Sequence, residues 1–167
     1  MQKEPMTEKD YNILTSKLND LKLVQRPKIL ISIEEARQLG DLKENAEYHA
    51  GKEEQANIDK KIAELDDMIT RVVIIDPSIL AHDKISFGST VKLIDVNSEE
   101  EIVYCITSSL HSNPDIGNIS FHSPLSKQLL GKSEGDAFTA TLPGGKKEFE
   151  IEEVYYDESK LWLMFLL

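Results

Sequence analysis

GDLKENAEYHA, residues 40–50, separates two long stretches of helical periodicity in this chain. Before it, apolar side chains recur every three or four residues at Leu14, Leu18 and Leu21, and again at Ile29, Ile33 and Ala36. After it, the same spacing runs through Ile58, Ile62, Leu65 and Ile69, which is typical of a coiled-coil seam. Gly40 favours the end of the first helix. The sequence therefore predicts an antiparallel helical hairpin whose turn lies at residues 40–48.

The predicted hairpin is long. Arms of about 30 residues, at about 1.5 Å per residue, give a rod of roughly 45 Å. Counting outward from the turn places Ile58 near Ile29 or Leu30, and Ile69 near Leu18. Pro27 has no backbone N–H and should kink or briefly break the first arm. Periodicity alone leaves a simple spacer and a dimerising coiled coil as alternative roles for such a rod.

From Asp76 onward the pattern changes to short runs rich in β-branched and aromatic residues, which are typical of strands. These runs are Thr90–Val96, Ile102–Thr107, Asn118–Phe121, Phe138–Leu142 and Glu148–Tyr156. Pro143-Gly144-Gly145 predicts a hairpin turn between the last two runs. A helix is marked by Ser123 as N-cap, Pro124 at its first position and Gly131 just past its end. The fold class is therefore α+β, with a helical hairpin in residues 1–76, a linker at 76–88 and a small α+β domain within 77–167.

The composition restricts the kind of partner. The formal net charge is −11; residues 1–76 carry 12 basic and 16 acidic side chains, and residues 77–167 carry 7 and 14. Neither half is a basic module, which argues against broad contact with a nucleic-acid backbone. A partner with a basic entrance would suit this acidic chain.

The composition also bears on location. The single cysteine, Cys105, cannot form an internal disulfide, and no N-terminal pattern typical of secretion is present. The longest apolar run, Leu161–Leu167, is too short to span a bilayer and is expected to form a final strand or a packed tail. We expect a cytoplasmic monomer without membrane contact.

Two interpretations fit the acidic residues of the turn. As a structural feature, Asp41 is a suitable N-cap for the second helix, and Glu44 would complete a capping box. As a functional feature, Asp41 and Glu44 would lie on one side of the first helical turn, where their oxygens could bind a hard cation such as Mg²⁺. Two carboxylates make an incomplete metal site, which is useful mainly when another molecule supplies the remaining ligands.

GDLKENAEYHA is also one of a series of short motifs along nearly the whole chain. The others are MQKEPMT at the start, Arg26-Pro27, Glu35-Ala36-Arg37, Ile74-Ile75-Asp76, Phe87-Gly88-Ser89-Thr90-Val91, Ile119-Ser120 with Ser123-Pro124-Leu125, Leu130-Gly131-Lys132, Gly135-Asp136 and Pro143-Gly144-Gly145. In this order and at this spacing, the motifs closely resemble those of the bacterial Gre transcript cleavage factors, and of the GreA branch in particular.

The resemblance implies a fold and a function. Gre factors have an N-terminal antiparallel coiled coil and a C-terminal domain similar to the FKBP fold. The C-terminal domain docks on RNA polymerase, and the coiled coil enters the secondary channel of that enzyme. There the factor stimulates the polymerase's own Mg²⁺-dependent cleavage of the 3′ end of backtracked RNA. The implied role is that of an accessory factor, not of an independent enzyme.

The resemblance also assigns roles to individual residues. Asp41 and Glu44 match the acids that hold Mg²⁺ jointly with the polymerase. Asn45 and Tyr48 match supports of the tip or of the RNA end, and Arg37 and Lys52 match a small basic patch near the transcript. Simple surface or packing roles remain open for these four. Ser120, Ser123 and Pro124 are the candidate polymerase-docking residues.

Three features depart from the family pattern. Gly51 replaces the usual alanine, which should cost about 1 kcal/mol of helix propensity. Ser108–Asn113 lacks the usual acidic pattern, and the apolar tail has no counterpart. Alternative functions are a Gre homologue that occupies the channel and inhibits without cleavage, a prolyl isomerase suggested by the FKBP-like half, and a self-sufficient metallohydrolase. The isomerase lacks an evident aromatic-lined pocket, and the hydrolase lacks a complete ligand set.

Overall fold

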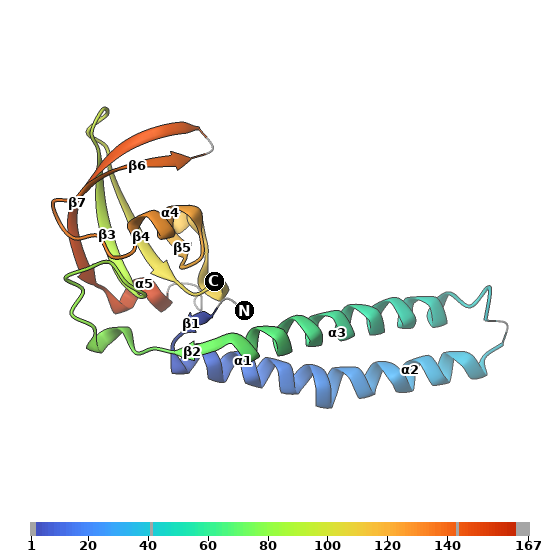
Figure 1. Cartoon of the computed structure of the whole chain (residues 1–167). Coiled ribbons are helices and arrows are strands. Elements are labelled where there is room, and N and C mark those ends of the chain that lie inside the picture. Colours follow the sequence, from blue (N-terminus) through green and yellow to red (C-terminus); the bar gives the residue numbers. More distant parts are fainter. Residues whose placement is uncertain (1–2, 41, 143, 163–167) are drawn as a thin grey trace. The chain divides into compact units, whose positions relative to one another are not determined.

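A computed structural model describes residues 3–40, 42–142 and 144–162 of the chain (Figure 1). The chain forms two compact units. The first contains Lys9–Val72, and the second contains Glu4–Glu8 together with the chain from Val73 onward. The second unit therefore includes a short N-terminal segment that lies far from the rest of it in sequence.

The first unit is the predicted helical hairpin. One arm consists of α1 (Glu8–Asp20), the π-helical turn η1 (Leu21–Gln25) and α2 (Arg26–Gln38). The other arm is the single helix α3 (Ala46–Arg71), which runs antiparallel to α2 (Figure 1). The mixed helical and sheet fold class predicted from the sequence is confirmed.

Pro27 does not break the first arm. The residues before it form one π-helical turn, in which the N–H of Arg26 donates to the carbonyl of Leu21, five residues earlier. Proline lacks an N–H and its ring crowds the carbonyl four residues before it, so a wider turn at this point accommodates both. The expected interruption therefore takes the form of a π-turn inside continuous helical backbone.

Ion pairs and apolar contacts set the register of the two arms. Lys22 Nζ lies 2.7 Å from Asp66 Oδ2, and Arg26 Nε lies 2.7 Å from Asp59 Oδ1. Such half-exposed pairs contribute little free energy, but their geometry fixes which residues face each other. Ile29 and Ile58 line one small groove between the arms, in agreement with the predicted register.

Gly51 is buried where the arms pack closely. A Cβ atom at this position would lie 2.8 Å from Cγ1 of Ile33, which is too close for two carbon atoms. The glycine that weakens α3 by its low helix propensity therefore makes room for Ile33 on the opposite arm.

The second unit is built on a five-stranded sheet with the order β5-β4-β3-β7-β6. Its strands are β3 (Ser89–Asp95), β4 (Glu101–Thr107), β5 (Asn118–Ser120), β6 (Ala137–Leu142) and β7 (Gly145–Tyr156). All neighbours are antiparallel except β4 and β5, which are parallel. Leu142 pairs with Gly145, so the predicted hairpin connection lies between β6 and β7, although Pro143 itself lies outside the described residues.

Short elements complete this unit. They are the strands β1 (Glu4–Met6) and β2 (Val72–Ile74), the helices α4 (Pro124–Leu129) and α5 (Glu158–Trp162), and the 3-10 turns η2 (Pro77–Ile79), η3 (Ser109–His111) and η4 (Pro114–Ile116). The strands β1 and β2 pair with each other. Of the two alternatives expected for the C-terminal apolar run, a final strand or a packed tail, its described beginning is not a strand: Leu161 lies in α5 and is buried. Residues 163–167 lie outside the described part of the chain.

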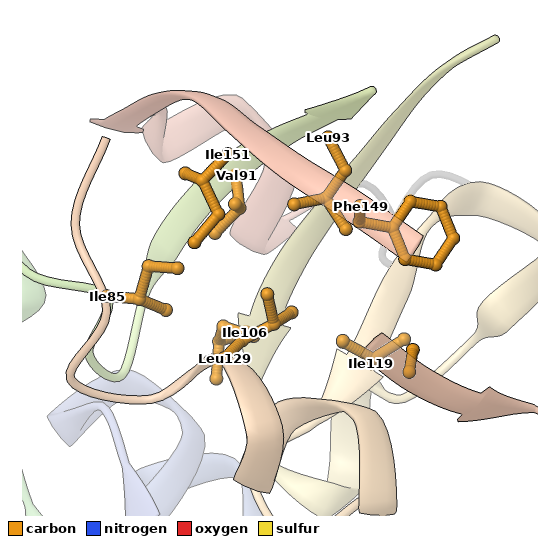
Figure 2. Packing of buried hydrophobic residues seen from close by; sticks show 9 residues of the cluster. Ile85, Val91, Leu93, Ile106, Ile119, Leu129, Phe149 and Ile151 are labelled. Carbon is orange, nitrogen blue, oxygen red and sulfur yellow. The ribbon is translucent and has the colours of Figure 1, made fainter. Parts of the chain in front are cut away.

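The core of this unit lies between the sheet and α4 (Figure 2). Val91 and Leu93 of β3, Ile106 of β4, and Phe149 and Ile151 of β7 contribute side chains that are almost completely buried. Leu129 closes the core from α4. Among the described residues, no helix is both long enough and apolar enough to cross a membrane.

We predict that Gly51→Ala does not stabilise the hairpin. Alanine gains about 1 kcal/mol in helix propensity over glycine, but overpacking against Ile33 costs about 1–3 kcal/mol. The free energy of unfolding, measured by urea titration of the helical circular dichroism signal, should therefore stay unchanged or fall.

Ala56→Gly is the matched control for this change, because Ala56 lies on the exposed face of the same helix. It should lower the free energy of unfolding by about 1 kcal/mol through propensity alone. An increase of about 1 kcal/mol in the free energy of unfolding of Gly51→Ala would contradict this prediction, because it would show that the Ile33 side chain can move aside without an energetic cost.

Candidate functional site

The tip of the hairpin is the connection between α2 and α3. The N–H of Leu39 still donates to the carbonyl of Ala36, so this residue ends α2. Gly40 follows with a φ of +136°, a conformation that residues with a Cβ rarely adopt. Residues 42–44 form a turn, and Asp41 lies outside the described residues.

Asn45 is the N-cap of α3. Its Oδ1 accepts a hydrogen bond from the N–H of Tyr48 at 2.9 Å, and its Nδ2 donates to the carbonyl of Ala36 at 2.7 Å. One amide therefore caps α3 and also satisfies a carbonyl group in the last turn of α2. A carboxylate at this position could accept the first bond but could not donate the second.

This cap corrects the structural interpretation of the acidic residues. The predicted N-cap, Asp41, lies four residues before the actual one, and α3 begins only at Ala46. Glu44 therefore precedes the cap and does not stand in the first turn of α3, so the expected placement of Glu44 in that turn is wrong, whereas Asp41 lies outside the described residues. Asparagine caps helices as well as aspartate does, so residue type alone does not distinguish Asn45 from Asp41 as the N-cap.

Glu44 has an exposed side chain. Among the described residues it has no hydrogen-bond or ion-pair partner, so its carboxylate is available to a ligand from outside the chain. The described residues contain no group of three or more His, Cys, Asp or Glu side chains that could hold a metal ion by themselves. Any cation held by Glu44 would therefore need ligands from elsewhere.

Tyr48 and His49 support the turn from the first residues of α3. The N–H of Tyr48 donates to Oδ1 of the N-cap Asn45. The Tyr48 ring packs edge to face against the His49 ring, at 5.7 Å between centroids. His49 Nε2 lies 3.2 Å from the carbonyl oxygen of Lys43, which ties the turn to the helix. Sequence reasoning assigned no role to His49, because a histidine without ligand spacing gives no local signal.

The two basic candidates lie on opposite arms. Arg37 is in the last turn of α2, exposed, and 3.6 Å from Glu34 on the same helix. Lys52 of α3 donates to Gln55 Oε1 at 2.6 Å. Each side chain thus contacts a neighbour on its own helix and is exposed, which leaves it able to meet an anionic partner.

The three docking candidates form one turn in the second unit. Ser120 ends β5, and its carbonyl accepts from the N–H of Ser123 at 2.8 Å. Ser123 caps α4, accepting from the N–H of Ser126 at 3.1 Å. Pro124 follows as an exposed residue at the first position of α4. We call residues 120–124 the docking turn.

Comparisons with known proteins identify the family. Residues 4–74 match the family model described as "Transcription elongation factor, N-terminal", and residues 80–156 match "Transcription elongation factor, GreA/GreB, C-term". The transcription elongation factor GreA of Aliarcobacter butzleri (strain RM4018) is 55% identical over 161 residues, covering 96% of this chain and 100% of that protein. GreA of Sulfurovum sp. (strain NBC37-1) is 51% identical over 161 residues, covering 96% and 99%.

A solved structure also resembles this chain. The crystal structure of GreA factor homolog 1 of Thermus thermophilus covers 92% of this chain and 99% of its own, with 28% identity and a TM-score of 0.44. The sequence matches extend through both units. The chain therefore belongs to the GreA/GreB family of transcription elongation factors.

Proposed function

We propose that this protein binds RNA polymerase, inserts its helical hairpin into the secondary channel and stimulates the polymerase's own Mg²⁺-dependent cleavage of backtracked RNA at the 3′ end. It would act in the cytoplasm as a monomeric accessory factor. The observation that carries this proposal is the cap at Asn45, which closes the tip without using Glu44. Glu44 is thereby left exposed, on a chain that belongs to a family of transcription elongation factors.

The donor chemistry of the tip fits a shared Mg²⁺ site. Mg²⁺ prefers carboxylate oxygens and keeps several waters, so one or two acids suffice when a partner supplies the rest. Glu44 would offer one such carboxylate, and Asp41 would offer the second. When bound, the ion would lower the pKa of a coordinated water and stabilise charge on the attacking and leaving oxygens.

The chain's own residues would position the acids. Asn45 is hydrogen-bonded to both arms, and Gly40 supplies the positive φ that the turn requires. The His49 ring contacts the carbonyl oxygen of Lys43. Arg37 and Lys52 would face the negatively charged RNA end. The polymerase must hold the rest of the strand, since a chain of net charge −11 would repel it.

The two units would divide the work. The acids belong to the hairpin, and the docking turn belongs to the second unit. Affinity for the polymerase would therefore depend mainly on residues 120–124, and stimulation of cleavage on the tip.

We predict that Asp41→Asn and Glu44→Gln abolish most of the stimulated cleavage. Each amide keeps an oxygen atom but loses the negative charge that a Mg²⁺ site needs. Both variants should still bind polymerase. Because neither acid caps α3, their free energies of unfolding should stay within about 0.5 kcal/mol of the parent. The measurement is release of 3′-labelled fragments from a backtracked elongation complex at limiting Mg²⁺.

Two controls separate charge from folding. Glu47→Gln removes an exposed carboxylate from the first turn of α3 and should cleave like the parent. Asn45→Ala removes the cap and should lower the free energy of unfolding by about 0.5–2 kcal/mol. Cleavage at the parental rate by Glu44→Gln would remove Glu44 from the metal site.

We predict that the isolated protein does not hydrolyse RNA. The described residues hold no complete metal-binding group, so free RNA with Mg²⁺ should remain intact. Addition of a backtracked polymerase complex should restore cleavage. Polymerase-free hydrolysis that persists through further purification would indicate a self-sufficient hydrolase. Binding to polymerase without release of labelled fragments would indicate the channel-occupying inhibitor instead.

A further inference from the structure

The N-terminal strand of the chain is built into the second unit. The strand β1 pairs with β2, and the carbonyl of Met6 accepts from the N–H of Ile75 at 2.9 Å. Met6 is completely buried. The strand is therefore a structural part of the unit that also contains the docking turn.

Glu4, in this strand, places a carboxylate inside the second unit. The residue is only 3% exposed. Its Oε1 accepts a hydrogen bond from the N–H of Ser109 at 2.9 Å, and its Oε2 lies 2.9 Å from Nε2 of His122. A carboxylate can be buried at acceptable cost only when its oxygens are engaged in this way.

These two contacts reach both loops that flank β5. Ser109 begins the turn η3, before β5, within the segment Ser108–Asn113 that departs from the family pattern. His122 lies after β5, in the docking turn itself. The hydroxyl groups of Ser109 and Ser120 lie 3.4 Å apart, so the two loops also approach each other directly.

Backbone hydrogen bonds hold the main chain of the docking turn, and Glu4 contacts the side chain of His122. The N–H of Phe121 donates to the carbonyl of Thr107 at 2.8 Å, which fixes the turn to β4. The N–H of His122 donates to Ser120 Oγ at 3.2 Å. The His122 ring meets the Phe121 ring edge to face at 5.4 Å between centroids. The contact with Glu4 orients the His122 ring, and this ring in turn packs against Phe121 in the docking turn.

We infer that Glu4 is a positioning residue for the docking turn, holding Ser109 and His122 with one buried carboxylate so that residues 120–124 keep the conformation that binds polymerase. This inference rests on the proposed function, because it assumes that the docking turn meets the polymerase. Glu4 itself, being buried, does not contact the partner.

The test uses the full-length protein and measures its affinity for polymerase by competition against a labelled parent protein. Glu4→Gln keeps an oxygen for the N–H of Ser109 but removes the charge beside His122. We expect its affinity to fall by about fivefold to tenfold, within the range for residues that affect binding without contacting the ligand. Glu4→Ala, which loses both contacts, should bind more weakly still. Stimulated cleavage at saturating factor should match the parent, because the tip is unchanged.

Glu8→Gln is the matched control, since it removes the same charge from an exposed position four residues on. It should bind like the parent. A double-mutant cycle then separates positioning from general destabilisation. In a His122→Ala background, Glu4→Gln should have almost no further effect on affinity. Thermal melting of each variant would show that all are folded at the assay temperature.

The outcomes are distinct. Parental affinity of Glu4→Gln, or full additivity with His122→Ala, would overturn the positioning role while leaving the proposed function intact. Failure of the parent protein itself to bind polymerase would overturn the proposed function. Because the experiment measures binding, it tests the role of Glu4 even if this protein occupies the channel without stimulating cleavage.

Discussion

Asn45 is bonded to both arms of the hairpin at once, through an oxygen that caps α3 and a nitrogen that meets the carbonyl of Ala36 in α2. Helix ends leave backbone groups without partners, and a turn this tight has few side chains that can satisfy them. A neutral amide does so for both helices. Glu44, which precedes this cap, is exposed and has no partner among the described residues.

The hairpin could be predicted because its signal is local and repeated. The seam at Ile58, Ile62, Leu65 and Ile69 specifies a helix and its buried face, and the turn follows from where the pattern is interrupted. The capping residue could not be chosen in the same way. Asp41 and Asn45 both satisfy the N-cap rule, and only the approach of Ala36 from the other arm favours an amide.

Elements that depend on distant partners escaped prediction. The strand β1 is only three residues long, and nothing near it in the sequence indicates that it pairs with β2. Gly51 likewise looked like a cost to α3, since its benefit lies with Ile33 on the opposite arm. The π-turn before Pro27 was expected only as some disturbance of the helix. For β1 and Gly51 the decisive contact lies with residues far away in the sequence, whereas the π-turn has a local cause in Pro27.

The second unit is assembled from two separate stretches of the sequence. Residues 4–8 belong to the second unit, the hairpin follows, and the chain returns to the second unit at Val73. The hairpin is thus connected to the second unit at both of its ends. A fragment that starts at residue 77, the predicted domain boundary, would lack Glu4 and Met6, and with them a buried carboxylate and a buried core side chain. The strand β1 is therefore part of the second unit, and the hairpin is an insertion between that strand and the rest of the unit.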